Sequence, residues 1–196
     1  MTGLVPVALT ETDLPMAELA CARLDGELFS LAGSWCPIDA LDGPETRAGA
    51  IQPAAPRRAA AERLTAAWIY GLVPEPTVHQ FCVDIGARTR NPPGATVHLR
   101  EVRLDRADAV RFGSLLVTSP LRTAVDLARW GEAPGHPADP VLIAALLARA
   151  GVGGADSAGM HPSDPGAASL AGPRGRSFTR IAERALEDAL KLLARA

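Results

Sequence analysis

The chain has 196 residues, 47% of them apolar and 4% aromatic, which is enough for one or two small domains with a core of alanine, leucine and valine. The formal net charge is −2, no apolar run approaches the ~18 residues of a membrane-spanning helix, and the start does not resemble a signal peptide. Three cysteines without a Cys-x-x-Cys pair argue against a disulfide framework or a zinc site, so we expect a cytoplasmic protein with reduced thiols.

Charge is distributed unevenly along the chain. Residues 1–43 carry seven acidic side chains and one arginine, whereas residues 44–130 carry eight acidic side chains and twelve arginines. Residues 131–196 carry seven of each sign. Proteins bind nucleic acid with cations that displace its condensed counterions. The middle of the chain, not its beginning, is therefore the part expected to meet nucleic acid.

Residues 1–43 are predicted to form a helix followed by a small hairpin. Thr12 or Asp13 can cap the helix, and Asp25-Gly26 ends it. Two short extended runs then flank Ala32-Gly33, a pair typical of a tight turn. Helix followed by hairpin is the second half of a winged helix, although a full one needs roughly sixty residues. We predict a reduced winged-helix-like segment packed on the rest of the protein.

Residues 44–150 are predicted to form an α/β body that begins with helical sequence. Over residues 57–71 apolar side chains recur at helical spacing, and Gly71 ends the pattern. Trp68 lies on the apolar side of this helix, where a large aromatic ring more often packs in a core than contacts a ligand.

Three extended runs in the body, residues 78–85, 96–104 and 115–117, are predicted to form a small sheet covered by helices. The alternation of apolar and polar residues slips near Glu101, which predicts a β-bulge there. The expected fold class is therefore α+β, with mixed elements.

The best-defined local motif follows the third extended run. Ser119 is a natural N-cap, and Pro120 suits the first position of a helix, where no amide proton is needed. Arg122 and Asp126 are one turn apart and can pair, a contact worth a few tenths of a kcal/mol in this order. Ser119, Pro120, Arg122, Asp126 and Trp68 are therefore predicted to form a structural hub.

The run Thr-Ser-Pro-Leu-Arg-Thr-Ala-Val-Asp-Leu, residues 118–127, resembles a signature of the AbiEi family. Residues 65–71 are similar to the Ala-Ala-Trp-x-x-Gly segment of that family, and residues 24–28 to its helix-to-wing junction. The resemblance, to the actinobacterial type, implies an antitoxin and transcriptional regulator of a type IV (abortive infection) toxin–antitoxin system. It also implies operator DNA and a nucleotidyltransferase-type toxin as partners.

Four arginines of the body are the candidate contacts to nucleic acid or to a partner. Arginine binds phosphate oxygens, and each such contact adds affinity that falls with salt. The alternative, equally open at this point, is that these side chains are solvated or paired with nearby carboxylates. The candidates are Arg88, Arg90, Arg100 and Arg103.

An enzymatic function is the less favoured hypothesis. Asp84 followed by Glu101-Val102-Arg103 resembles the Asp…Glu-x-Lys spacing of metal-dependent nucleases related to very-short-patch-repair-like endonucleases. An arginine in place of the lysine is a poor substitute, because it does not easily deprotonate. We expect no catalytic residue, no metal and no cofactor. A protein-interaction module that has lost DNA binding is the other alternative.

The last part of the chain is predicted to hold two helices joined by a linker. Residues 139–150 are an apolar helix that ends the body, and residues 151–176 are rich in Gly, Ala, Ser and Pro, as flexible linkers are. Residues 177–196 form an amphipathic helix. Such a helix either docks back on the body or joins two chains in a homodimer.

Overall fold

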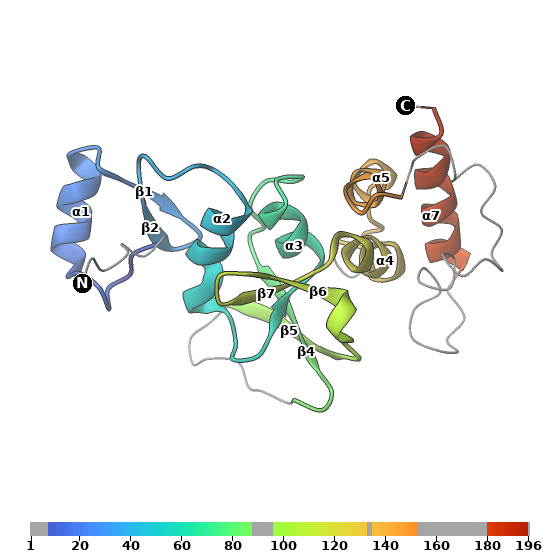
Figure 1. Cartoon of the computed structure of the whole chain (residues 1–196), viewed down its shortest axis with the longest axis horizontal. Helices are drawn as coiled ribbons and strands as arrows, with labels where there is room; N and C mark the ends of the chain where they lie inside the picture. Colours follow the sequence, from blue (N-terminus) through green and yellow to red (C-terminus); the bar gives the residue numbers. More distant parts are fainter. Residues whose placement is uncertain (1–7, 88–95, 133–134, 153–179, 196) are drawn as a thin grey trace.

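A computed structural model describes residues 8–87, 96–132, 135–152 and 180–195 (Figure 1). A small N-terminal lobe lies at one end of the molecule, a five-stranded sheet with helices in the middle, and a C-terminal helix at the other end. The α+β class is confirmed. None of the described helices has the length and apolar character to cross a bilayer.

The N-terminal lobe contains the predicted helix and hairpin. Helix α1, Met16–Leu24, precedes strands β1, Leu28–Leu31, and β2, Ser34–Pro37, which pair antiparallel. Ala32 and Gly33 join the strands with φ angles of 50° and 76°, as a two-residue hairpin turn requires. That the lobe is a reduced winged helix stays a prediction.

The predicted cap of the first helix is wrong. The residue before α1 is Pro15, and no side chain caps the helix. The Asp13 carboxylate instead accepts the backbone N–H of Thr10 at 2.8 Å, in the turn that precedes the helix. Asp13 lies two residues before the N-cap position, so its side chain does not bind an amide of the first helical turn.

Two polar contacts attach the hairpin to the body. The hydroxyl of Ser34 donates to the carbonyl of Ala50 at 2.7 Å, at the end of helix α2, Pro44–Ile51. The backbone N–H of Ala32 donates to the Glu75 carboxylate at 3.3 Å. A short 3-10 turn, η1, Gln52–Ala54, follows α2. The lobe is therefore anchored through its turn and its second strand.

The sheet has the strand order β5-β4-β3-β7-β6. Its centre, β3, pairs antiparallel with β4 and parallel with β7, while β4 runs parallel to β5 and β6 antiparallel to β7. The strands are β3, Ala60–Ala61; β4, His79–Asp84; β5, Val97–Val102; β6, Ala109–Phe112; and β7, Leu115–Thr118.

The helix predicted over residues 57–71 is only partly right. The structure has strand β3 in its first part and helix α3, Arg63–Ile69, in its second. Alanine is a good helix former, so local propensity predicts the wrong state at residues 60–61. Pairing on both sides with β4 and β7 overrides that propensity. The edge strand β6 was not predicted.

The predicted bulge near Glu101 is also wrong. β4 and β5 pair residue by residue, from His79 opposite Val97 to Asp84 opposite Val102. The slip in the sequence pattern comes from Glu101 and Val102, which exchange the polar and apolar positions within a regularly paired strand.

Two neighbouring rows of residues cross the whole sheet and point to opposite faces. One row is apolar, from β5 to β6: Leu99, Phe81, Ala61 and Val117 contribute to the core, and Val110 at the edge is 40% exposed. The next row has an arginine at each end: Arg100, Cys82, Ala60, Leu116 and Arg111. This second face carries both Arg100 and Arg111.

Three helices complete the molecule beyond the sheet. They are α4, Pro120–Trp130; α5, Pro140–Arg149; and α7, Arg180–Leu193. Helix α7 packs on α4 and α5, and Ala189 is fully buried there (Figure 1). The structure thus has the docked arrangement of the last helix. A homodimer through its remaining surface stays a prediction, and most of the predicted linker lies outside the described residues.

Candidate functional site

The predicted hub begins at the junction of β7 and α4. Ser119 caps the helix, its hydroxyl accepting the backbone N–H of Arg122 at 3.3 Å, and Pro120 is the first helical residue. The backbone N–H of Ser119 donates to the carbonyl of Asp108 at 2.7 Å, beside the 3-10 turn η2, Arg106–Asp108. The cap and the proline are confirmed as structural elements.

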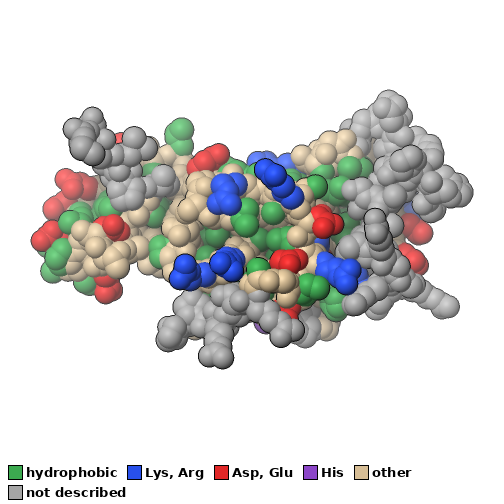
Figure 2. All heavy atoms as spheres, turned by 60° about the horizontal axis from the view of Figure 1, so that its bottom comes forward, with side chains coloured by type: hydrophobic (Ala, Val, Ile, Leu, Met, Phe, Trp, Pro, Cys, Tyr) green, Lys and Arg blue, Asp and Glu red, His purple; other side chains and the backbone are tan. Residues whose placement is uncertain are grey.

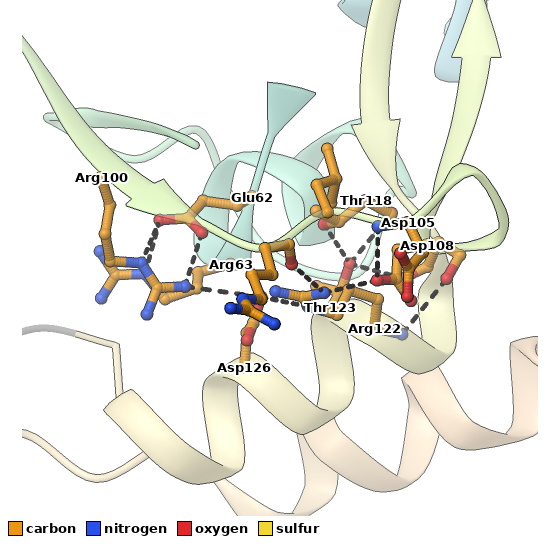
Figure 3. Close-up of polar contacts among 12 residues, drawn as sticks. Glu62, Arg63, Arg100, Asp105, Asp108, Thr118, Arg122, Thr123 and Asp126 are labelled. Carbon is orange, nitrogen blue, oxygen red and sulfur yellow. Dashed lines mark hydrogen bonds and ion pairs between the residues drawn. The ribbon is translucent and has the colours of Figure 1, made fainter. Parts of the chain in front are cut away.

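Arg122 connects three parts of the chain through its guanidinium group (Figure 3). Its Nε donates to Asp126 at 2.9 Å, and its Nη1 donates to the Asp108 carboxylate at 2.6 Å and to the carbonyl of Arg103 at 3.1 Å. The predicted Arg122–Asp126 pair is therefore present. It does not stand alone on an exposed flank, since Asp126 is buried and shares a larger network.

The centre of that network is Glu62, which is 0% exposed and follows directly after β3. Arg100 on β5 binds it with two hydrogen bonds, of 2.7 and 3.0 Å, and also lies 3.5 Å from Asp126. Burial by itself lowers the pKa of Arg100, but the hydrogen bonds and charge of Glu62 outweigh it, so the pKa is raised. Arg100 and Glu62 therefore form a two-point ion pair.

Arg63 is the strained member of the network. Its φ angle is 46°, a left-handed conformation that costs a non-glycine residue of order 1 kcal/mol or more. Its buried Nε has no hydrogen-bond partner among the described residues and lies 3.5 Å from a Glu62 oxygen. Burial lowers the pKa of Arg63, opposed by the charge of Glu62. We call Glu62, Arg63, Arg100, Arg122 and Asp126 the ion-pair hub.

Aromatic side chains lie around the ion-pair hub. The ring of Trp130 lies 5.0 Å from the Arg100 guanidinium carbon. Tyr70 donates its hydroxyl to the carbonyl of Thr118 at 2.7 Å, and burial raises the pKa of Tyr70 to about 12. Trp68 is buried in the core, beside the ring of His79. Its predicted role as a core anchor fits this position.

A second set of arginines differs from the hub because its members are exposed. Within the part of the chain that the structure describes, none of them forms an ion pair with a carboxylate. We call this set the exposed arginines: Arg57, Arg58, Arg103, Arg106 and Arg111. Figure 2 shows Lys and Arg side chains spread over the middle of the molecule.

Residues 59–150 match the family model described as the AbiEi antitoxin C-terminal domain. The chain carries a domain of the AbiEi antitoxin family. The AbiEi domain includes the sheet, the ion-pair hub and helix α5. The resemblance drawn from the signature is thereby confirmed, while its actinobacterial type stays a prediction.

Other comparisons add little to this assignment of the AbiEi domain. No curated protein matches the chain. The crystal structure of the RV2827C protein from Mycobacterium tuberculosis is similar at 16% sequence identity and a TM-score of 0.37. That similarity covers 94% of this chain and 72% of the other.

The four candidate binding arginines do not form one group in the AbiEi domain. Arg100 belongs to the ion-pair hub, and 18% of its side chain is exposed. Arg103 is exposed, directly after β5. Arg88 and Arg90 lie outside the described residues. Binding by any of the four stays a prediction, and the geometry favours Arg103 over Arg100.

Sequence reasoning missed Glu62 and Arg63 as members of the hub. Both lie in the stretch predicted as one long helix, where a Glu-Arg pair reads as a solvated face. A signal was present in Arg100, a charged residue within a strand of the predicted sheet. Such a residue demands a partner if the strand is covered by a helix.

The nuclease alternative depends on Asp84 and Glu101 meeting at one metal. Asp84 is opposite Val102 in the register, and Glu101 is opposite Val83, so the two carboxylates point to opposite faces of the sheet. Asp84 accepts the backbone N–H groups of Gly86 and Leu104 at 2.8 and 3.0 Å, which lower its pKa. Among the described residues no three metal-ligating side chains are grouped.

Proposed function

We propose that this chain is an antitoxin-type regulator that acts by binding, through the arginine-bearing face of its AbiEi domain, and not by catalysis. The antitoxin family of residues 59–150 supports the regulatory role. The binding role is supported by one contrast in the structure. Arginines of the hub have carboxylate partners, whereas the exposed arginines have none in the described chain.

Nucleic acid is the partner that this contrast favours. An exposed guanidinium without an internal ion pair offers its donors to phosphate oxygens without breaking a contact within the protein. The N-terminal lobe is less suited to that role. Its acidic side chains dominate the left end of the molecule in Figure 2, and residues 1–43 contain one arginine.

The first test is a titration of the chain with duplex DNA taken from upstream of its own gene. Replacing Arg88 and Arg90 together by Ala is expected to reduce the slope of log K against log salt by close to two, because each lost phosphate contact removes about 0.9. Fluorescence anisotropy at several salt concentrations measures it. Lys191→Ala, on α7 and paired with Asp188, is the matched control.

An unchanged slope in the Arg88/Arg90 variant, with wild-type binding intact, would remove these two residues from the interface. Absence of any salt-dependent binding to DNA by the wild type would refute the nucleic-acid part of the proposal. The antitoxin role would then rest on a protein partner.

A protein partner is the second candidate, favoured by the surface of the N-terminal lobe. Leu24 and Leu41 are 86% and 87% exposed, amid an excess of acidic side chains. Large apolar side chains that are this exposed are available to a protein partner. Co-expression with the product of the adjacent gene, expected to be a nucleotidyltransferase-type toxin, tests it. Co-purification and relief of growth inhibition would support this function. If Leu24→Ser loses neither of them, Leu24 is not part of the toxin-binding surface.

A further inference from the structure

A hollow of about 490 Å³ lies on the face of the sheet that carries Arg111, beside the turn η2, whose Asp108 binds Arg122 of the ion-pair hub. Strands β6 and β7 form its floor with Arg111, Ala109 and Leu116, and the turn η2 and the end of β5 form one wall. Three of the exposed arginines line it: Arg58, Arg106 and Arg111.

The two carboxylates in the same hollow are already used by the backbone. Each oxygen of Asp84 accepts a backbone N–H, from Gly86 and from Leu104. Asp105 caps η2, with its side chain accepting the backbone N–H of Asp108. Neither forms an ion pair with a lining arginine. Three guanidinium groups therefore face two carboxylates that hold the loops in place, which leaves an excess of cationic hydrogen-bond donors.

Arg58 has a left-handed backbone conformation, which is uncommon for a residue other than glycine. It lies in the turn before β3, closed by the hydrogen bond from the Ala59 N–H to the Pro56 carbonyl at 3.0 Å, and its φ angle is 62°. Glycine or asparagine is the usual residue at such a position. The side chain of Arg58 is exposed and lines the hollow. A strained backbone that carries a long cationic side chain into a hollow indicates a binding role.

We propose that this hollow is a phosphate-binding site in which Arg58, Arg106 and Arg111 hold one phosphate group of a nucleic-acid backbone. The site rests on the proposed function, which it deepens by naming a place of contact on the body. Arg111 keeps donors for a phosphate group. Its Nη1 donates to the carbonyl of Ser114 at 3.2 Å, and its other guanidinium nitrogens have no partner in the described chain. Free phosphate has the same chemistry as the backbone group and is a second source of ligand.

The test combines three variants of the full chain with three probes. Arg58→Gly, Arg106→Ala and Arg111→Ala are titrated with a labelled mixed-sequence duplex, with a labelled single strand, and with inorganic phosphate. Each variant is expected to weaken duplex binding about tenfold but to reduce the salt slope by less than about one, because the three side chains share one phosphate group. Arg106→Lys keeps the positive charge but loses the paired N–H donors of the guanidinium group. It is expected to lose less affinity than Arg106→Ala.

Lys191→Ala, on α7 and paired with Asp188, is the matched control. Arg57→Ala tests whether the effect is confined to the hollow, because Arg57 is the exposed neighbour of Arg58 and does not line the hollow. A loss with Arg57→Ala equal to that of the three variants would overturn the site and leave a diffuse cationic surface. Wild-type affinity in all three variants would overturn it too, even when the chain binds DNA.

Arg58→Gly separates binding from folding. Glycine relieves the left-handed conformation, so the thermal midpoint is expected to stay unchanged or rise while affinity falls. A midpoint that falls together with affinity would assign Arg58 a structural role and refute its part in the site. If the duplex and the single strand do not bind but inorganic phosphate does, and the three variants abolish it, the phosphate site stands and the nucleic-acid function fails.

Discussion

Arg100 and Arg111 lie at opposite ends of the same row across the sheet, on the two edge strands, yet their surroundings differ completely. Arg100 is covered by α4 and binds the fully buried Glu62 through two hydrogen bonds. Arg111 is exposed and its guanidinium donates to one carbonyl. The difference arises from β3, after which the chain places Glu62 toward β5 and not toward β6. Topology, not residue type, decides whether an arginine is structural or available.

The largest effect is expected from removing the carboxylate at the buried end of this row. Glu62→Gln leaves Arg100 and Arg63 with too little counter-charge in a buried site, which costs about 3–5 kcal/mol of unfolding free energy. Urea denaturation measures it, with the exposed Glu45→Gln as the control, expected to stay within about 0.5 kcal/mol.

Adding Arg100→Met to Glu62→Gln is expected to recover a large part of that loss, because removing both charges avoids an unpaired buried one. Equal stabilities of Glu62→Gln and Glu45→Gln would show that the ion-pair hub does not hold the fold. The comparison between the two ends of the row would then lose its basis.

An intermediate effect is expected at Tyr70, behind the hub. Tyr70→Phe removes the hydrogen bond to the buried carbonyl of Thr118, at a cost of about 1–1.5 kcal/mol near neutral pH. Since burial raises the pKa of Tyr70 to about 12, from about 10 in the unfolded chain, the stability it contributes is complete below pH 10. That contribution is lost as the pH rises from about 10 to about 12.

The stability difference between wild type and Tyr70→Phe is thus expected to shrink over this pH window. Tyr70 is the single tyrosine of the chain, so its ultraviolet absorbance reports its ionisation directly. A phenol that titrates near 10 in the folded protein would contradict its burial against Thr118.

The smallest effects are expected at the exposed end of the row. Arg106→Ala and Arg111→Ala should each change the unfolding free energy by less than about 0.5 kcal/mol, because neither side chain is buried or ion-paired in the described chain. Urea denaturation beside Glu62→Gln measures the contrast. Losses above about 2 kcal/mol would place these arginines in the scaffold and not on a binding face.

The parts of the fold that the sequence predicts correctly are those with local chemical signals. Turn residues Ala32 and Gly33 locate the hairpin, and Ser119 with Pro120 locates the start of α4. Each depends on interactions within a few residues, which is why one sequence is sufficient. The pair Arg122–Asp126 is also local, and it is present as predicted.

The parts that the sequence does not predict depend on distant partners. Ala60 and Ala61 have helical propensity, and only their pairing with β4 and β7 makes them a strand. Glu62 is recognisable as buried only once Arg100 is known to face it from β5. The same holds for the candidate site, since Arg58, Arg106 and Arg111 come from separate segments that the sheet brings to one hollow.

The brevity of β3 has a consequence for how the AbiEi domain comes apart. Within the described chain, β3 with its two alanines is the only strand whose pairing joins the parallel β4–β5 ladder to the β6–β7 hairpin in one sheet. If these pairings opened, the sheet would divide into two parts and the apolar row would be interrupted. The pairing of β3, the shortest strand, therefore determines whether the sheet of the AbiEi domain unfolds as one cooperative unit.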